Sequence, residues 1–432
     1  MQVFRYPPQE NWASILKRPV IDNIRLNSTV QEVLAKVRDE GDAALFTYTK
    51  QFDGVDLDSL VVNEAEIQAA EKSVPAELKS AIRLAANNIR QFHEAQLQQP
   101  VFIETMPGVK CWRKSIGIEK VGVYIPGGTA PLFSTVLMLG IPAKIAGCRE
   151  IVLCSPPNKS GQLHPAILFA ASVVGITKIF KLGGVQAIAA MAFGTGTIPR
   201  VFKIFGPGNQ YVTAAKQLVQ QFGVAIDMPA GPSEVAVFAD ETANAVFVAA
   251  DLLSQAEHGI DSQVLLVTTA EKMILQVQAE IDRQIQCLSR KEIAQKALEN
   301  SKFILLNNEN EAMELLNVYA AEHLILATDR SMELSEKVIN AGSVFLGHHS
   351  PESVGDYASG TNHTLPTNGY ATAYSGVSVD SFVRKVTYQQ LSTHGLQHIA
   401  ACVITMAEAE GLDAHARAVS IRTESANKAA KL

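Results

Sequence analysis

Two adjacent side chains in the segment AEHLILAT could carry proton transfer. Glu322 and His323 stand directly before an apolar run that is typical of a buried strand. A carboxylate beside an imidazole supplies two bases, which suits a reaction with two proton transfers. Polar residues are also common where strands begin, so the pair permits this chemistry without specifying a reaction.

A second pair lies in the segment LLSQAEHG. Gln255 and His258 are three residues apart near the end of a predicted helix, which places them on one helical face. An amide oxygen and an imidazole nitrogen in that arrangement could share a metal ion. The alternative is a histidine that the helix dipole favours at a helix C-terminus.

Three further polar candidates lie toward the C-terminus. Asp356 belongs to the segment 347–376, which is rich in Gly, Ser, Thr, Asn and Tyr and has no periodicity. A long loop of this kind in a compact protein is usually functional or disordered, and its aromatic residues favour function. Glu410 and His415 flank a predicted turn at Gly411. A lone histidine in a tail is normally a solvated side chain.

Glycine-rich loops follow several apolar runs in the middle of the chain. They are Gly127-Gly128, Gly183-Gly184, Gly206-Pro207-Gly208 and Pro229-Ala230-Gly231-Pro232. Backbone N–H groups of such loops can face an anion such as a pyrophosphate. Glycine also simply permits tight strand-to-helix turns. Because several loops fall in one half of the chain, we predict a nucleotide site there, although no GxGxxG fingerprint with a following acidic residue is present.

Short apolar runs alternate with helix-length segments from Lys120 to Gly347. This alternation predicts βαβ units, and continuously apolar runs are typical of parallel strands covered on both faces. We therefore expect an α/β fold with two consecutive open, mostly parallel, Rossmann-like sheets. The first would cover residues 119–232 and the nucleotide side. The second would cover residues 233–378 and carry the metal and catalytic residues.

The regions that flank the two sheets are predicted to be helical. Residues 1–118 are expected to form a helical segment that packs on the second half, with Ser28 and Thr29 as candidate N-cap residues. Residues 379–432 are expected to form an extended helical tail.

The composition excludes several classes of protein. Lys plus Arg total 37 and Asp plus Glu total 43, a formal net charge of −6 that argues against nucleic acid as a partner. Hydrophobic residues make up 47%, which is typical of a globular chain. The five cysteines show no CxxC spacing, so reduced thiols are expected. No signal-peptide pattern or membrane-spanning apolar run is visible, so we expect a cytoplasmic protein.

A set of motifs occurs in a fixed order along the chain: VGVYIPGG, FGPGN, IDMPAGPSE, LLSQAEHG, EHL, SPESVGDYASGTNHTLPT and a tail with AE, G, L and AH. Over essentially the whole chain this set resembles histidinol dehydrogenase, and LLSQAEHG together with GDYASGTNH is highly specific. The resemblance implies a zinc-containing, NAD-dependent enzyme that oxidises L-histidinol to L-histidine through L-histidinal, the last two steps of histidine biosynthesis. It also implies one Zn²⁺ per subunit, two NAD consumed per histidinol, and a homodimer in which the tail reaches the neighbouring subunit's site.

The resemblance assigns a role to each site residue. The zinc ligands would be Gln255, His258, Asp356 and His415. His323 would be the general base, and Glu322 would deprotonate the water that the aldehyde step needs. The substrate contacts would be Ser233, Gln255, His258, Glu322, His323, Asp356, Glu410 and His415. The NAD contacts would be Tyr124, Gln186 and Asn209.

Three other histidines have no assigned role. His348 and His349 are adjacent in a loop, where solvation is the expected state because neighbouring side chains point different ways. His363 lies near Asp356 and could support that ligand without binding the metal itself.

Two alternatives remain open. An aldehyde-dehydrogenase-like enzyme would use Cys154, which closes a predicted strand, as a nucleophile. Small cysteines are, however, common in apolar cores. A two-domain small-molecule binding protein would need a secretion signal and gives no reason for Glu322 beside His323. No acidic residue decides NAD against NADP, so NAD rests on the resemblance.

Overall fold

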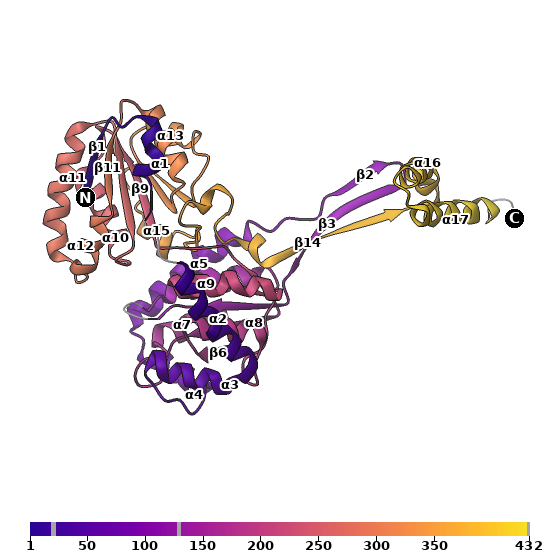
Figure 1. Ribbon diagram of the computed structural model, residues 1–432, viewed down its shortest axis with the longest axis horizontal. Helices are drawn as coiled ribbons and strands as arrows, with labels where there is room; N and C mark the ends of the chain where they lie inside the picture. The colour runs from indigo at the N-terminus through magenta and orange to yellow at the C-terminus, as the bar shows by residue number, and fades with distance from the viewer. Residues whose placement is uncertain (19–22, 128–130, 430–432) are drawn as a thin grey trace. The chain divides into compact units, whose positions relative to one another are not determined.

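The chain divides into two compact units. The first unit comprises Met1–Gln96 and Ile118–Phe382, and the second comprises Leu97–Gly117 and Val383–Leu432. The computed structural model describes residues 1–18, 23–127 and 131–429 (Figure 1). Gly128 of the first glycine-rich loop lies outside the described residues.

The first unit contains a five-stranded parallel sheet with the order β6-β5-β4-β7-β8. Its strands are β4 (Lys120–Tyr124), β5 (Glu150–Ser155), β6 (Lys178–Lys181), β7 (Lys203–Phe205) and β8 (Ala225–Ile226). Successive strands move outward from β4 to β6 and then return to β7 on the other side of β4. The order therefore reverses between β4 and β7, where open α/β sheets bind ligands.

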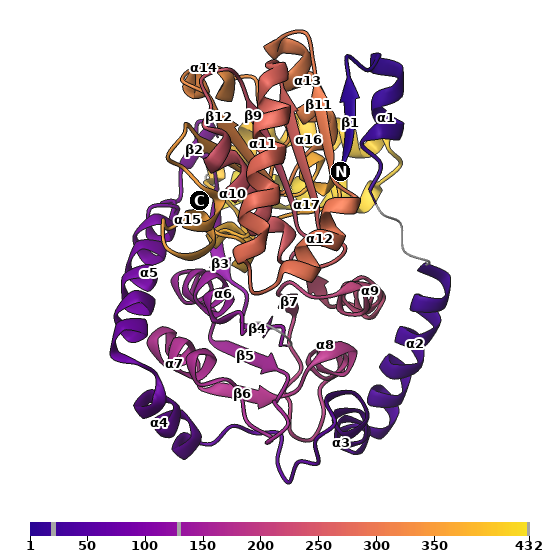
Figure 2. The ribbon, with the colours of Figure 1, turned by 90° about the vertical axis from the view of Figure 1, so that its left-hand side faces the viewer.

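Helices cover both faces of this sheet (Figure 2). They are α6 (Phe133–Ile145) and α7 (Pro165–Val174) on one face, and α8 (Gly184–Phe193) and α9 (Gln210–Val219) on the other. Alternate residues of the strands join different cores: Leu153 packs with α6 and α7, whereas Val152 and Cys154 pack with α8 and α9. This alternation explains why the strands are apolar throughout.

The helices between Asn23 and Glu94 add an outer layer to this first sheet, so the prediction that residues 1–118 pack on the second half was wrong for them. It was right for residues 1–16, which join the second sheet and its core. The helices of the outer layer are α2 (Asn23–Glu40), α3 (Asp42–Tyr48), α4 (Glu64–Ser73) and α5 (Ala76–Glu94). Val30, Val33 and Val37 of α2 join the core of α8 and α9, and Ile82 and Ile89 of α5 join the core of α6 and α7. The second half does not need them, because it has helices of its own on both faces.

The expected N-cap of the first long helix was also wrong. Helix α2 begins at Asn23, so Ser28 and Thr29 lie inside it. The helix ends at Glu40, before Gly41 with φ of 57°.

The second sheet of this unit has six parallel strands with the order β1-β11-β10-β9-β12-β13. The strands are β1 (Gln2–Arg5), β9 (Glu234–Ala239), β10 (Gln263–Thr268), β11 (Lys302–Leu305), β12 (His323–Ala327) and β13 (Ser343–Leu346). Strand β1 pairs with β11, so the first residues of the chain form an edge strand rather than the expected helix.

Helices cover both faces of the second sheet as well. One core contains residues of α10 (Ala245–Ala256), α11 (Glu271–Gln284) and α12 (Lys291–Glu299), and the other contains residues of α1 (Trp12–Ile15), α13 (Glu309–Tyr319) and α14 (Ser331–Ser335). Val237 of β9 packs in the first core and Phe238 in the second. The segment 347–376 follows β13 and contains a short α-helix, α15 (Glu352–Tyr357), and a 3-10 helix (Tyr370–Thr372).

The second unit combines a three-stranded antiparallel sheet with two helices. Its elements are β2 (Phe102–Met106), β3 (Val109–Gly117), β14 (Val383–Leu391), α16 (Thr393–Ala409) and α17 (Asp413–Ala429). Tyr388 pairs with Trp112 across β14 and β3, and their rings stack with centroids 5.4 Å apart. The prediction of a helical tail was wrong in part, because the tail begins with the strand β14. This strand mixes polar and apolar residues, so its sequence has no buried-strand pattern. Among the described helices, none is long and apolar enough to cross a membrane.

We expect Gly206→Ala to destabilise the protein far more than Gly147→Ala. Both glycines have positive φ, 132° and 83°, but an added Cβ at Gly206 would lie 2.1 Å from the carbonyl oxygen of Tyr124, whereas Gly147 faces open space. Urea unfolding should show a loss of about 3 kcal/mol for Gly206→Ala and about 1 kcal/mol for Gly147→Ala. Equal losses would mean that the turn after β7 tolerates a side chain.

Candidate active site

The two candidate bases lie at the amino edge of the second sheet. His323 begins β12 and is paired in register with Val235 of the neighbouring strand β9. Glu322 Oε2 accepts a hydrogen bond from the N–H of Glu234 at 2.9 Å, and His323 Nδ1 lies 3.3 Å from the carbonyl oxygen of Glu234. Because a carbonyl only accepts, this contact favours the tautomer with the proton on Nδ1. It leaves Nε2 as the basic atom of His323.

Asp356, on the short helix α15, faces the same imidazole. His323 Nε2 and Asp356 Oδ1 are 3.3 Å apart. Both atoms are buried, and neither has another hydrogen-bond partner among the described residues. Two orphaned buried polar atoms that face each other are the pattern expected where a ligand completes a site.

Gln255 reaches the site from the last turn of α10. Its side chain is 1% exposed, and its amide nitrogen lies 3.3 Å from Glu322 Oε2. The rotated amide satisfies both of its polar atoms, since its nitrogen then donates to Glu352 Oε1 and its oxygen accepts from the N–H of Glu234. His258 lies two residues beyond the helix, and its N–H donates to the Gln255 carbonyl at 3.2 Å.

At this edge the carboxyl groups of Glu322, Glu352 and Asp356 lie around the imidazole of His323. Burial alone would lower the pKa of the His323 imidazole, but the carboxylates of Glu322 and Asp356 raise it well above its ordinary value. Burial raises the pKa of the Glu322 carboxyl, against the opposing effect of His323. Burial also raises the pKa of Glu352 to about 8. Glu352, which the sequence did not single out, accepts a hydrogen bond from Ser254 at 2.7 Å.

The side chain of His363 contacts the backbone of Asp356. Its Nδ1 lies 2.8 Å from the Asp356 carbonyl oxygen, and its Nε2 lies 3.1 Å from the hydroxyl of Thr135 on α6. The loop that carries Asp356 is thereby tied to the first half of the unit. His348 and His349 lie just beyond the carboxyl end of β13 instead, and His348 contacts Asp329 at 3.0 Å rather than being merely solvated.

The three candidate NAD residues line one cavity of about 830 Å³ at the carboxyl edge of the first sheet. The Tyr124 hydroxyl accepts a hydrogen bond from the N–H of Gly184 at 3.1 Å. Asn209 caps the N-terminus of α9 through its side-chain oxygen. Gln186 is 1% exposed, and its Oε1 has no partner among the described residues. Asp53 also lines the cavity, although no motif in the sequence marks it, and burial raises the pKa of its carboxyl to about 6.

The remaining candidates divide between the two units. Ser233 immediately precedes β9 and is partly exposed. Glu410 and His415 belong to the second unit, where they are exposed on either side of the expected turn at Gly411, with φ of 71°. Among the described residues, no group of three or more His, Cys, Asp or Glu side chains could hold a metal ion. Three of the four expected zinc ligands, Gln255, His258 and Asp356, belong to the first unit.

Cys154 is fully buried at the end of β5, and burial raises the pKa of its thiol. A reactive cysteine needs thiolate character and access, and this one has neither. The nucleophile alternative is therefore not supported.

The fold and these two sites define an α/β enzyme with a cavity at the reversal point of one sheet and acid–base groups on the edge of another. A sequence profile of the histidinol dehydrogenase family matches residues 16–423. Histidinol dehydrogenase of Bacteroides thetaiotaomicron is 62% identical over 98% of this chain and 99% of its own, and that of Bacteroides fragilis is 61% identical over 99% and 100%. The crystal structure of histidinol dehydrogenase from Elizabethkingia anophelis superposes with a TM-score of 0.97 at 55% identity, covering 99% of both chains.

The chain belongs to the histidinol dehydrogenase family. It is accordingly an oxidoreductase.

We expect Cys154→Ala to retain oxidoreductase turnover. The side chain fills space between β5 and the α8–α9 layer, so the substitution should cost about 1 kcal/mol of stability without touching the chemistry. Steady-state kinetics alongside thermal unfolding would show this, and loss of turnover in a folded variant would restore the nucleophile alternative.

Proposed function

We propose that this protein oxidises L-histidinol to L-histidine through L-histidinal, consuming two NAD, as the last two steps of histidine biosynthesis. The names of its close relatives support the substrate. The observation that carries the proposal is the buried Glu322–His323 pair, with one basic imidazole nitrogen aimed at Asp356.

The two bases would divide the proton transfers. His323 Nε2 takes the hydroxyl proton of histidinol, while its Nδ1 stays hydrogen-bonded to the Glu234 carbonyl. The aldehyde then needs a hydroxide equivalent, and Glu322 deprotonates a water. Each positioned base contributes roughly 10²–10⁴-fold to the rate. NAD, when bound, accepts the hydride, and Tyr124, Gln186 and Asn209 would hold it in the cavity of the first sheet.

The zinc set would consist of Gln255, His258, Asp356 and His415. Mixed nitrogen and oxygen donors suit zinc, and the orphaned Asp356 Oδ1 supports a missing ligand at this place. Zinc, when bound, would act as a Lewis acid and template for the imidazole and amine of the substrate. With no thiolate in the set, the metal should be exchangeable.

The second unit supports a homodimer with shared sites. Its buried residues, within the described part, are Val109, Gly395, Ala400, Ala407 and Ala416. They are too few and too small to form a core. Large apolar side chains such as Phe102, Ile103 and Met406 are instead 61%, 53% and 60% exposed. Exposed apolar surface of this extent marks an interaction site, and we propose a second copy of this chain as the partner, with Glu410 and His415 completing the partner's site.

A cofactor-reduction assay tests the proposal. L-histidinol with NAD should yield two reduced cofactors per substrate, and a chelator should abolish the reaction until zinc is added. His258→Asn should bind less zinc by metal analysis, since one of only two nitrogen donors is lost. Full activity in metal-free protein, or one reduced cofactor per histidinol, would contradict the proposal.

The two bases should separate kinetically. His323→Asn should depress oxidation of both histidinol and histidinal, because one imidazole serves both steps. Glu322→Gln should spare the alcohol step more than the aldehyde step, since only the latter needs an activated water. Rates measured separately with the two substrates decide this, and equal losses for Glu322→Gln would refute the division of roles.

Shared sites predict complementation between two inactive variants. In a heterodimer of His323→Asn and His415→Asn, one site is intact and the other carries both defects. Random reassociation makes about half of the dimers mixed, so roughly a quarter of wild-type activity should return. If a mixture shown to contain heterodimers stays inactive, each chain builds its own site.

A further inference from the structure

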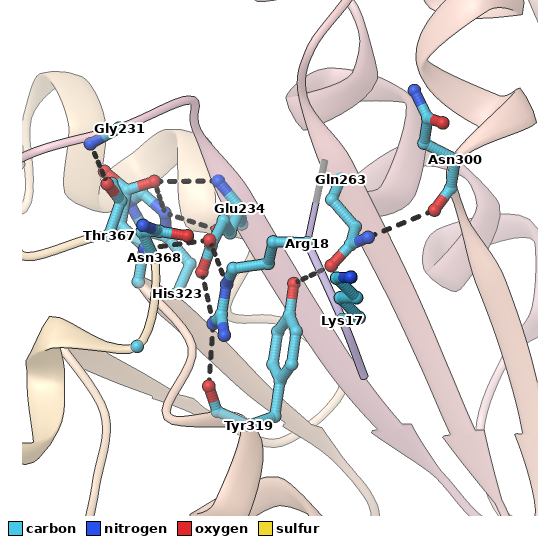
Figure 3. A network of polar contacts seen from close by, with 12 residues as sticks. Lys17, Arg18, Gly231, Glu234, Gln263, Asn300, Tyr319, His323, Thr367 and Asn368 are labelled. Carbon is cyan, nitrogen blue, oxygen red and sulfur yellow. Dashed lines mark hydrogen bonds and ion pairs between the residues drawn. The ribbon is translucent and has the colours of Figure 1, made fainter. Parts of the chain in front are cut away.

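Glu234 is a buried carboxylate to which the proposed mechanism gives no role. It is 2% exposed and begins β9, directly after Ser233. Its two oxygens accept hydrogen bonds from Arg18 Nε at 2.5 Å and Nη2 at 2.8 Å, a bidentate ion pair (Figure 3). Such pairs fix orientation as well as charge, because both groups are planar.

The backbone of the same residue holds the catalytic pair. The Glu234 N–H donates to Glu322 Oε2, and its carbonyl oxygen contacts His323 Nδ1. One residue therefore joins Arg18 on its side chain to both proposed bases on its main chain. A shift of the Glu234 backbone would therefore change its contacts with Glu322 and His323 together.

Arg18 also contacts Tyr319, which lies shortly before the two proposed bases in the chain. Its Nη2 donates to the Tyr319 carbonyl at 2.7 Å, and its guanidinium lies 4.2 Å from the centroid of the Tyr319 ring. Tyr319 ends α13, and the next residue, Ala320, is left-handed with φ of 51°. That conformation is unfavourable for alanine and persists only where the surroundings impose it. The strained turn leads directly to Glu322.

A third connection runs to the loop that carries Asp356. The N–H of Asn368 donates to Glu234 Oε1 at 2.8 Å, and Asn368 is itself left-handed with φ of 56°. The preceding residue, Thr367, accepts a hydrogen bond from the N–H of Gly231. The Glu234 carboxylate thus ties this loop to the same anchor as the two bases.

We propose that the Arg18–Glu234 ion pair positions Glu322, His323 and the loop 347–376 for catalysis, with Arg18 acting as a positioning residue. Within the described residues, the contacts of Arg18 are with Glu234 and Tyr319 and not with the candidate site residues, so its effect passes through those two. The catalytic part of this inference rests on the proposed function. The ordering of the strained turn and of the loop does not.

The test compares Arg18→Ala and Arg18→Lys with wild type, with Arg330→Ala as a matched control. Arg330 is also an ion-paired arginine of the second half, with Glu309 and Glu333 as partners, but it is half exposed and shares none of the contacts described above for Arg18. Arg18→Ala should lower kcat for histidinol and histidinal by about 10–100-fold, the cost of a small misplacement of catalytic groups. Its KM for NAD should not change. Added ethylguanidinium should restore part of the kcat of Arg18→Ala. The kcat of Arg18→Lys should lie between those of Arg18→Ala and wild type.

Hydrogen–deuterium exchange provides a readout that does not depend on the reaction. Peptides that cover residues 319–328 and 364–372 should exchange faster in Arg18→Ala, whereas peptides from β4 to β7 and all peptides of Arg330→Ala should match wild type. Wild-type kcat in Arg18→Ala overturns the catalytic role. A kcat loss that guanidinium does not rescue, with exchange raised everywhere, shows a structural role only. If the wild-type enzyme does not oxidise histidinol, the proposed function is wrong. Faster exchange confined to residues 319–328 and 364–372 in Arg18→Ala would still show that Arg18 orders these segments.

Discussion

The parallel pairing of β9 with β12 is the constraint on which the rest of the site depends. It sets His323 opposite Val235, so the residues just before both strands, Ser233 and Glu322, arrive at the same edge. A slip of one residue would reverse the face of every side chain in β12. The two different cores on the two faces of the sheet exclude that slip, because Leu324 packs in one and Ile325 in the other. Apolar packing thereby fixes the position of the polar pair.

The candidate sites of the two sheets lie at opposite edges, the carboxyl edge in the first and the amino edge in the second. Helix dipoles give a reason for this difference. The cavity of the first sheet lies at carboxyl ends of strands, where helices such as α9 begin and their N-termini favour phosphate. The candidate bases of the second sheet lie at the amino ends of its strands, where α10 and α13 end. Helix C-termini favour positive charge. An edge of this kind suits a metal cation and an imidazole whose pKa is raised by its neighbours.

Local sequence determined much of this architecture and left other parts undetermined. The runs from KVGVYIP to SVFLG were all confirmed as strands, because a strand buried on both faces is apolar throughout. The strand β14 gave no such signal, since most of its residues are exposed. The sequence could not show which sheet α2 covers, because its valines fit either core. Arg18 and Glu234 were missed for a similar reason: their pairing joins positions 216 residues apart, and no local pattern records it.

The position of Arg18 at the start of the chain has a consequence for the order of assembly. Strand β1 pairs with β11 some 300 residues later, and Arg18 meets Tyr319 after 301 residues. The first sheet needs only strands between Lys120 and Ile226, so during synthesis from the N-terminus it can form early. Residues 1–18 cannot pair with β11 or contact Tyr319 until those later residues have been synthesised. Contacts of such high sequence separation form late, so we expect the first sheet to fold before the amino edge of the second sheet is complete.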